Sequence, residues 1–176
     1  MRNSYDPVDV QRFCDLLTSR IASAFDPSKP LNIVGIRTRG EVLAQRLTKS
    51  LANSGFSDIG RGVLDITLYR DDLSEIGPRP LVRPTQIDID LDDNPLLLVD
   101  DVLFTGRSIR AAMGALNDFG RPSVIRLAVL VDRGGRELPI QPDFVGLTLS
   151  DVPKDHRVNV HFSETDGQDE ILVEPM

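Results

Sequence analysis

Two adjacent carboxylates and the turn that follows them are the residues in this chain best suited to chemistry. Asp100 and Asp101 come directly after the apolar run 96–99, and Thr-Gly-Arg-Ser follows at 105–108. Adjacent acids at a strand end can bind a metal, hold a sugar diol or act in acid–base catalysis. The turn offers main-chain N–H groups, two hydroxyls and a guanidinium to a phosphate. Together these groups match a ribose 5-phosphate, with the carboxylates accepting from its 2- and 3-hydroxyls.

The residues around this stretch predict how it is positioned. Four bulky apolar residues in a row at 96–99 are typical of a strand buried on both faces of a parallel sheet. Residues 108–119 have the spacing of a helix, with Gly120 as its C-cap. The acids should therefore lie at the carboxyl end of the strand, where open α/β sheets bind ligands. The turn should lie at the N-terminus of the helix.

Other segments repeat the strand, loop and helix order. Residues 31–36 predict a strand, 37–40 a basic loop and 41–54 a helix, while 124–131 predict another central strand before the loop 132–136. An opening helix is expected from Asp6, its cap, to Phe25. The order predicts an α/β fold with a doubly wound, mostly parallel sheet flanked by helices. The loops 37–40, 100–108 and 132–136 should converge in one crevice.

The remaining segments complete a single expected domain over residues 1–176. A strand is predicted at 62–68 and a half-exposed strand at 86–91. The polar loop between them, 69–85, has the length of a lid or a mobile segment, and its arginines favour a lid over an anionic ligand. Residues 158–162 and 171–173 predict a closing hairpin.

Composition restricts the class of protein. The chain is 40% hydrophobic and 27% charged, with a formal net charge of −7, one cysteine and no apolar run long enough to cross a membrane. An apolar signal core is absent from its N-terminus, so a cytoplasmic location is expected. The charge argues against strong non-specific binding of nucleic acid. Neither GxxxxGK[ST] nor GxGxxG is present, which argues against triphosphate and dinucleotide sites of those types.

The stretch 99–108 resembles the 5-phosphoribosyl 1-diphosphate (PRPP) signature of type I phosphoribosyltransferases. Three further segments, 35–40, 64–73 and 127–140, are similar to the family of bifunctional pyrimidine operon regulators and uracil phosphoribosyltransferases, the PyrR type. The resemblance implies that uracil and PRPP give UMP and diphosphate, with Mg²⁺ carried by the diphosphate, no direct protein ligand to the metal and no organic cofactor. It also implies UMP-dependent binding to leader RNA of pyrimidine genes, and a homodimer or higher homo-oligomer.

The resemblance also implies roles for matching residues. Asp100 and Asp101 would hold the ribose hydroxyls, and they form the implied catalytic group together with Arg39 and Arg70. The other implied roles are 5-phosphate binding by Phe104, Thr105, Gly106, Arg107 and Ser108; diphosphate binding by Thr38, Arg39 and Gly40; base binding by Val131, Asp132 and Arg133; and a place in the hood loop 69–85 for Arg70, Asp71, Arg79 and Arg83.

RNA contacts are the least specific of these expectations. Arg20, Lys154 and Arg157 are candidate contacts, whereas Ser23 and Gly135 stand where the family pattern has histidines. Two alternatives to the bifunctional enzyme stay open from the sequence. One is an RNA-binding attenuator that uses the pocket only to sense UMP and PRPP, and the other is a transferase for a different base.

Overall fold

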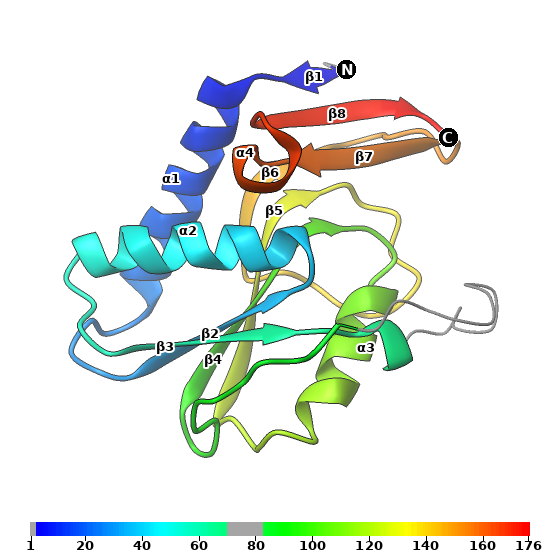
Figure 1. Cartoon of the computed structure of the whole chain (residues 1–176). Helices are drawn as coiled ribbons and strands as arrows, with labels where there is room; N and C mark the ends of the chain where they lie inside the picture. Colours follow the sequence, from blue (N-terminus) through cyan, green and yellow to red (C-terminus); the bar gives the residue numbers. More distant parts are fainter. Residues whose placement is uncertain (1–2, 70–82) are drawn as a thin grey trace.

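A five-stranded parallel sheet forms the centre of the computed structural model, which describes residues 3–69 and 83–176 (Figure 1). Its strands lie in the order β3-β2-β4-β5-β6, and each neighbouring pair is parallel. Their bounds are β2 Leu31–Ile36, β3 Ile59–Leu64, β4 Pro95–Leu103, β5 Val124–Asp132 and β6 Phe144–Thr148.

Helices cover both faces of this sheet, as the doubly wound prediction requires. α1 (Pro7–Ala24) and α2 (Arg39–Asn53) pack on one face, and α3 (Arg107–Leu116) packs on the other (Figure 1). β4 shows why its sequence is continuously apolar: Leu97 and Val99 join the core under α1 and α2, while Leu96 and Leu98 join the core under α3. The buried central strand and the α/β class are thus confirmed.

α1 begins where the sequence predicts. The Asp6 carboxylate accepts hydrogen bonds from the main-chain N–H groups of Val8, at 2.9 Å, and Asp9, at 3.0 Å. Pro7 occupies the first helical position, where a missing N–H costs nothing.

Replacing Asp6 with alanine should destabilise the protein by about 1 kcal/mol, because two N–H groups of the first turn lose their acceptor. Denaturant unfolding followed by circular dichroism measures this loss. Asn is a good cap, so Asp6→Asn should lose less than half as much, and equal losses in the two variants would contradict the capping role.

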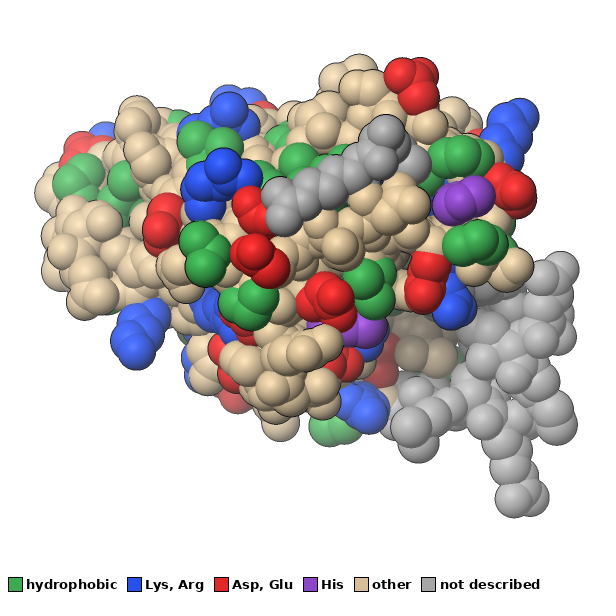
Figure 2. Space-filling view, turned by 90° about the horizontal axis from the view of Figure 1, so that it is seen from above, with side chains coloured by type: hydrophobic (Ala, Val, Ile, Leu, Met, Phe, Trp, Pro, Cys, Tyr) green, Lys and Arg blue, Asp and Glu red, His purple; other side chains and the backbone are tan. Residues whose placement is uncertain are grey.

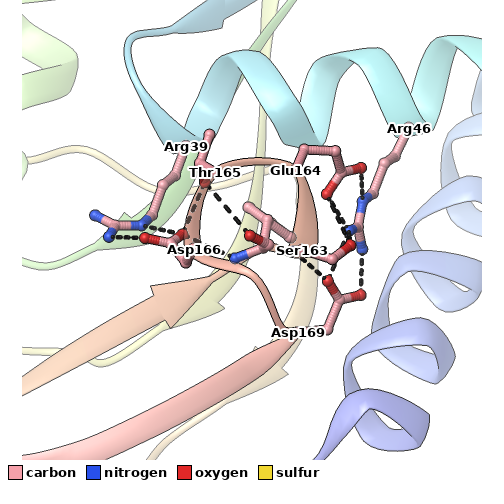
Figure 3. A network of polar contacts seen from close by, with 8 residues as sticks. Arg39, Arg46, Ser163, Glu164, Thr165, Asp166 and Asp169 are labelled. Carbon is pink, nitrogen blue, oxygen red and sulfur yellow. Dashed lines mark hydrogen bonds and ion pairs between the residues drawn. The ribbon is translucent and has the colours of Figure 1, made fainter.

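The closing hairpin belongs to a second, smaller sheet that the sequence did not predict. β7 (His156–His161) and β8 (Glu170–Pro175) are antiparallel, and β8 also pairs with β1 (Ser4–Tyr5). The one-turn helix α4 (Ser163–Asp166) joins β7 to β8. Apolar residues of the hairpin, including Val160 and Ile171, pack into the core under α1 and α2. The hairpin therefore brings α4 next to α2 (Figure 3).

Two predicted boundaries and one predicted strand are wrong. β3 ends at Leu64 and is followed by a short 3-10 turn, η1 (Thr67–Tyr69), so the predicted strand 62–68 is placed too late. Residues 86–91 form no strand beyond one bridge between Gln86 and Val63. α3 ends at Leu116, because the last residues before Gly120 form turns instead. Among the described residues, no helix is long and apolar enough to cross a membrane.

Candidate active site

A cavity of about 390 Å³ opens at the carboxyl ends of β2, β3 and β4. The loops after β2 and β4 meet there, as predicted, and the loop after β3 joins them. The lining residues are Ile36, Arg37, Thr38, Asp65, Ile66, Thr67, Arg83, Asp100, Asp101, Val102 and Ser108. The loop 132–136 does not line this cavity and lies instead beside the 104–108 turn.

Asp100 and Asp101 lie in the last part of β4, and a hydrogen bond joins them. The main-chain N–H of Asp101 donates to Oδ1 of Asp100 at 3.0 Å. Burial raises the pKa of Asp100 well above its usual range, and the neighbouring Asp101 carboxylate adds to the rise. Burial also raises the pKa of Asp101, whereas the positive charge of Arg39 opposes that rise. Ligand hydroxyls that donate to these carboxylates would favour their charged forms.

The turn 104–108 forms the N-terminus of α3. Gly106 has φ +92° at the cap position, a conformation that favours glycine. Gly106 has no side chain that could cap the main-chain N–H groups in the first turn of the helix. Uncapped N–H groups at a helix N-terminus favour binding of an anion. The hydroxyl of Thr105 accepts from the main-chain N–H of Arg107 at 3.3 Å, and Ser108 lines the cavity.

The loop after β2 is pressed against the end of β4. It contains a cis peptide bond between Arg37 and Thr38, and Thr38 lines the cavity. A Cβ on Gly40 would come 2.6 Å from the carbonyl oxygen of Val99 and 3.1 Å from Cα of Asp100. Only glycine allows this approach, which puts the first turn of α2 against the paired acids.

Arg39 points toward α4 rather than into the cavity (Figure 3). Its Nη2 and Nε donate to the two carboxylate oxygens of Asp166, at 2.8 and 3.2 Å. Two turns further along α2, Arg46 binds Glu164 and Asp169 of the same connection. The helix α2 and the C-terminal hairpin are thus joined by ion pairs.

The predicted base-binding residues lie beside the 104–108 turn. The Arg133 guanidinium stacks over the Phe104 ring at 3.8 Å from its centre and donates to the carbonyl of His156. Asp132 pairs with Arg136, whose guanidinium also donates to the carbonyl of Phe104. Val131 is fully buried in the core between β4 and β6, so its side chain cannot meet a base.

Gly135 fits tightly against this cluster. Its φ is +73°, and a Cβ at this position would come 2.6 Å from the Phe104 ring. Any side chain larger than that of glycine would require the ring to move.

Asp65 and Thr67 also line the cavity and were not among the predicted site residues, whereas Arg37, which lines it too, belongs to the predicted basic loop 37–40. Asp65 accepts from the main-chain N–H groups of Thr67 and Arg83, at 2.7 and 2.6 Å. The predicted strand 62–68 hid Asp65 within a strand, whereas β3 ends just before it. Arg83 lies in the described part of the hood loop; Arg70, Asp71 and Arg79 lie outside the described residues.

The three candidate RNA contacts come from different elements. Arg20 of α1 donates to the carbonyl of Val145 at 2.6 Å, Arg157 of β7 pairs with Glu174, and Lys154 precedes β7. On the face drawn in Figure 2, acidic and basic side chains alternate rather than gather by sign. That face offers no single basic patch of the kind that non-specific RNA binding uses.

The cavity carries hard oxygen donors. Asp65, Asp100 and Asp101 supply carboxylates, and Thr38 and Thr67 supply hydroxyls. Residues 3–69 and 83–176 hold no group of three or more His, Cys, Asp or Glu side chains arranged around a metal ion. Oxygen donors of this kind fit Mg²⁺, which keeps several waters and is usually shared between a few carboxylates and substrate phosphates.

Comparison with known proteins places this geometry in a class. A family model described as a phosphoribosyl transferase domain matches residues 10–163. The chain is 54% identical to the bifunctional protein PyrR of Desulfosudis oleivorans, covering 82% of this chain and 80% of that protein. It is 49% identical to the bifunctional protein PyrR of Thermus thermophilus, covering 93% of this chain and 90% of the relative. The chain belongs to the phosphoribosyltransferase domain family and, within it, to the bifunctional PyrR proteins.

Solved structures confirm the fold alone. The hypoxanthine phosphoribosyltransferase of Trypanosoma cruzi superposes with a TM-score of 0.72 at 17% identity, covering 100% of this chain and 98% of that one. A hypoxanthine phosphoribosyltransferase of Staphylococcus aureus gives a TM-score of 0.68 at 18% identity, with 94% and 88% coverage. The predicted type I phosphoribosyltransferase fold is therefore correct.

Proposed function

We propose that this protein transfers the 5-phosphoribosyl group of PRPP to uracil, giving UMP and diphosphate, and that UMP controls its binding to pyrimidine leader RNA. The observation that carries the proposal is the meeting of Asp100 and Asp101 with the N-terminus of α3 and the loop after β2 in one cavity. PRPP has a ribose, a 5-phosphate and a diphosphate. The paired acids suit the ribose, the N-terminus of α3 suits the 5-phosphate, and the loop after β2 suits the diphosphate.

The ribose and its phosphate fit the β4–α3 part of the cavity. The carboxylates of Asp100 and Asp101 would accept from the 2- and 3-hydroxyls, and the turn 104–108 would hold the 5-phosphate on its N–H groups. Breaking the C1–O bond develops positive charge on the ribose. Two carboxylates fixed beside the ring stabilise that charge, and the pocket contributes by positioning and electrostatics.

The leaving diphosphate fits the loop after β2. Thr38, Arg39 and Gly40 would contact it, with the charge of Arg39 offsetting the negative charge that develops there. Mg²⁺ bound with PRPP would supply further positive charge to the diphosphate, which would itself be the main ligand of the metal. The hood loop 69–85, including Arg70, Asp71, Arg79 and Arg83, would exclude water from the reacting atoms. All of these parts would belong to a single domain over residues 1–176.

The base fits the loop after β5. Uracil needs partners for its ring N–H groups and carbonyls, and main-chain groups beside 131–133 would supply them. The stacked Phe104 and Arg133 side chains border this position.

Both proposed activities use cytoplasmic molecules, PRPP and nascent RNA, and a homo-oligomer is the expected assembly.

An assay with radiolabelled uracil, PRPP and Mg²⁺ tests the transferase activity. Labelled UMP should form, and EDTA should abolish its formation because the diphosphate charge is then left without the metal. RNA binding without UMP formation would favour the alternative, a regulator that only senses UMP and PRPP. Absence of both would contradict the proposed function.

RNA binding should be strengthened by UMP and weakened by salt. Filter binding of a pyrimidine leader RNA at several salt concentrations measures both effects. If Lys154 contacts a phosphate, Lys154→Ala should reduce the salt slope by about 1. Arg126→Ala is the matched control, because Arg126 is exposed at the opposite, amino end of the sheet, where it pairs with Asp143. Equal slopes for Lys154→Ala and wild type would remove Lys154 from the RNA face.

A further inference from the structure

We infer that Asp166, in the connection between β7 and β8, is a positioning residue that fixes Arg39 for the diphosphate of PRPP. The inference rests on the proposed function, and it assigns a role in that site to the C-terminal hairpin, 127 residues away along the chain. It starts from the paired contacts in Figure 3.

The Asp166 carboxylate is itself held in place by its own turn. Its Oδ2 accepts from the main-chain N–H of Phe162 at 3.0 Å and from the Thr165 hydroxyl at 2.8 Å. Phe162 is fully buried, so the turn is anchored in the core. These hydrogen bonds, and above all the one from Arg39, hold the pKa of Asp166 well below its usual range. The acceptor is therefore charged and rigid before any ligand arrives.

Arg39 uses only one edge of its guanidinium for this contact. Nε and Nη2 donate to Asp166, at 3.2 and 2.8 Å, and a guanidinium has five N–H donors in all. Three donors are left for an anion, and the side chain is 38% exposed. Its positive charge already acts on Asp101 in the cavity. A long side chain fixed along one edge loses little further freedom when its other edge binds a diphosphate.

The second arginine of α2 provides an internal comparison. Arg46 lies seven residues after Arg39, on the same face of the helix, and binds Glu164 and Asp169. It stacks on Phe162 and lies two turns away from the cavity. The two arginines dock α2 on the same connection, but only Arg39 is next to the paired acids. Removing the partner of either one should weaken docking, and only the loss of Asp166 should weaken the hold on PRPP.

Calorimetric titration with Mg²⁺-PRPP, together with KM and kcat for UMP formation, tests this role. In Asp166→Asn, PRPP should bind about threefold to tenfold more weakly and KM for PRPP should rise with it. The value of kcat should fall as well, because Arg39 also offsets the charge that develops on the leaving diphosphate. Asp166→Glu should restore part of the affinity. Asp169→Asn should lower the melting temperature without changing PRPP affinity. In an Arg39→Ala background, Asp166→Asn should have no further effect on affinity, because Asp166 acts through Arg39.

The outcomes separate this inference from the proposed reaction. Unchanged or tighter PRPP binding in Asp166→Asn would overturn it, since tighter binding would mean that Asp166 competes with the diphosphate for Arg39. Equal weakening in Asp166→Asn and Asp169→Asn would also overturn it, leaving Asp166 a purely structural role. A wild-type protein that binds PRPP with this Asp166 dependence but makes no UMP would support the inference and contradict the transferase proposal. Failure of wild type to bind PRPP would overturn both.

Discussion

Asp100→Asn and Asp101→Asn are each expected to lower kcat/KM for UMP formation by at least about tenfold. A hydrogen bond to a charged group is worth about 1.5–3 kcal/mol, and about 1.4 kcal/mol corresponds to a tenfold change in rate. Asparagine keeps one acceptor oxygen but replaces the other with an NH₂ group, which cannot accept from a ribose hydroxyl. Steady-state kinetics with varied PRPP measures the loss, and wild-type rates in both variants would exclude the ribose role.

The same substitution at Asp100 should stabilise the protein without ligand. Burial raises the folded-state pKa of Asp100, so the unfolded state ionises first as pH rises. The cost of ionising the buried group is absent below the unfolded-state pKa of about 4 and grows as pH rises toward the folded-state pKa. It is present in full above that value. Asp100→Asn removes this cost.

Thermal unfolding at several pH values checks the sign. A gain of about 1 kcal/mol corresponds to a rise of roughly 2–4 °C in melting temperature for a chain of this size. The rise should be present at pH 8 and vanish near pH 4. Lower activity together with higher stability is expected of a buried acid kept for binding. A melting temperature that falls at pH 8 would contradict the burial cost.

Gly40→Ala is expected to have the second large effect, on both stability and activity. Its Cβ would lie 2.6 Å from the Val99 carbonyl oxygen, so α2 or β4 must shift. Overpacking of this kind costs about 1–3 kcal/mol. Because the shift would separate Thr38 and Arg39 from the paired acids, kcat/KM for PRPP should fall by about a hundredfold, the cost of a displacement of about 1 Å.

Gly114→Ala provides the matched control for this variant. Gly114 lies in α3, and a Cβ there would meet the Tyr69 ring at an ordinary contact distance of 3.9 Å. Alanine there should stabilise the helix by about 0.5–1 kcal/mol and leave kcat/KM unchanged. If Gly40→Ala were as stable and as active as Gly114→Ala, the close approach of α2 to β4 would not matter to the site.

Local pattern was enough to predict most of the sheet. The run 96–99 is apolar because β4 is covered on both faces, and Asp6 marks the start of α1 because caps follow local rules. The end of β3 was missed because Ile66 and Leu68 continue the alternation of a strand after the strand has ended. In the structure Ile66 is buried in the α3-side core from a loop position, which alternation alone cannot distinguish.

The paired acids and the turn 104–108 were found because they are contiguous in sequence. Asp65 and Asp166 were not identified from the sequence, for different reasons. Asp65 needs the correct end of β3, whereas Asp166 contacts Arg39 only because the hairpin packs against α2. A contact between residues 127 positions apart leaves no periodic signal in either segment.

The choice of acceptor base is the measurement that tests the proposed function most directly. Solved proteins with this fold include hypoxanthine phosphoribosyltransferases, so uracil and hypoxanthine should be compared at equal PRPP and Mg²⁺. We predict UMP formation with a kcat/KM for uracil at least about a hundredfold above that for hypoxanthine. A site whose polar groups match uracil would leave some of those groups without a partner when hypoxanthine binds. Faster formation of the hypoxanthine nucleotide would contradict the assignment of the base loop and the proposed reaction with it.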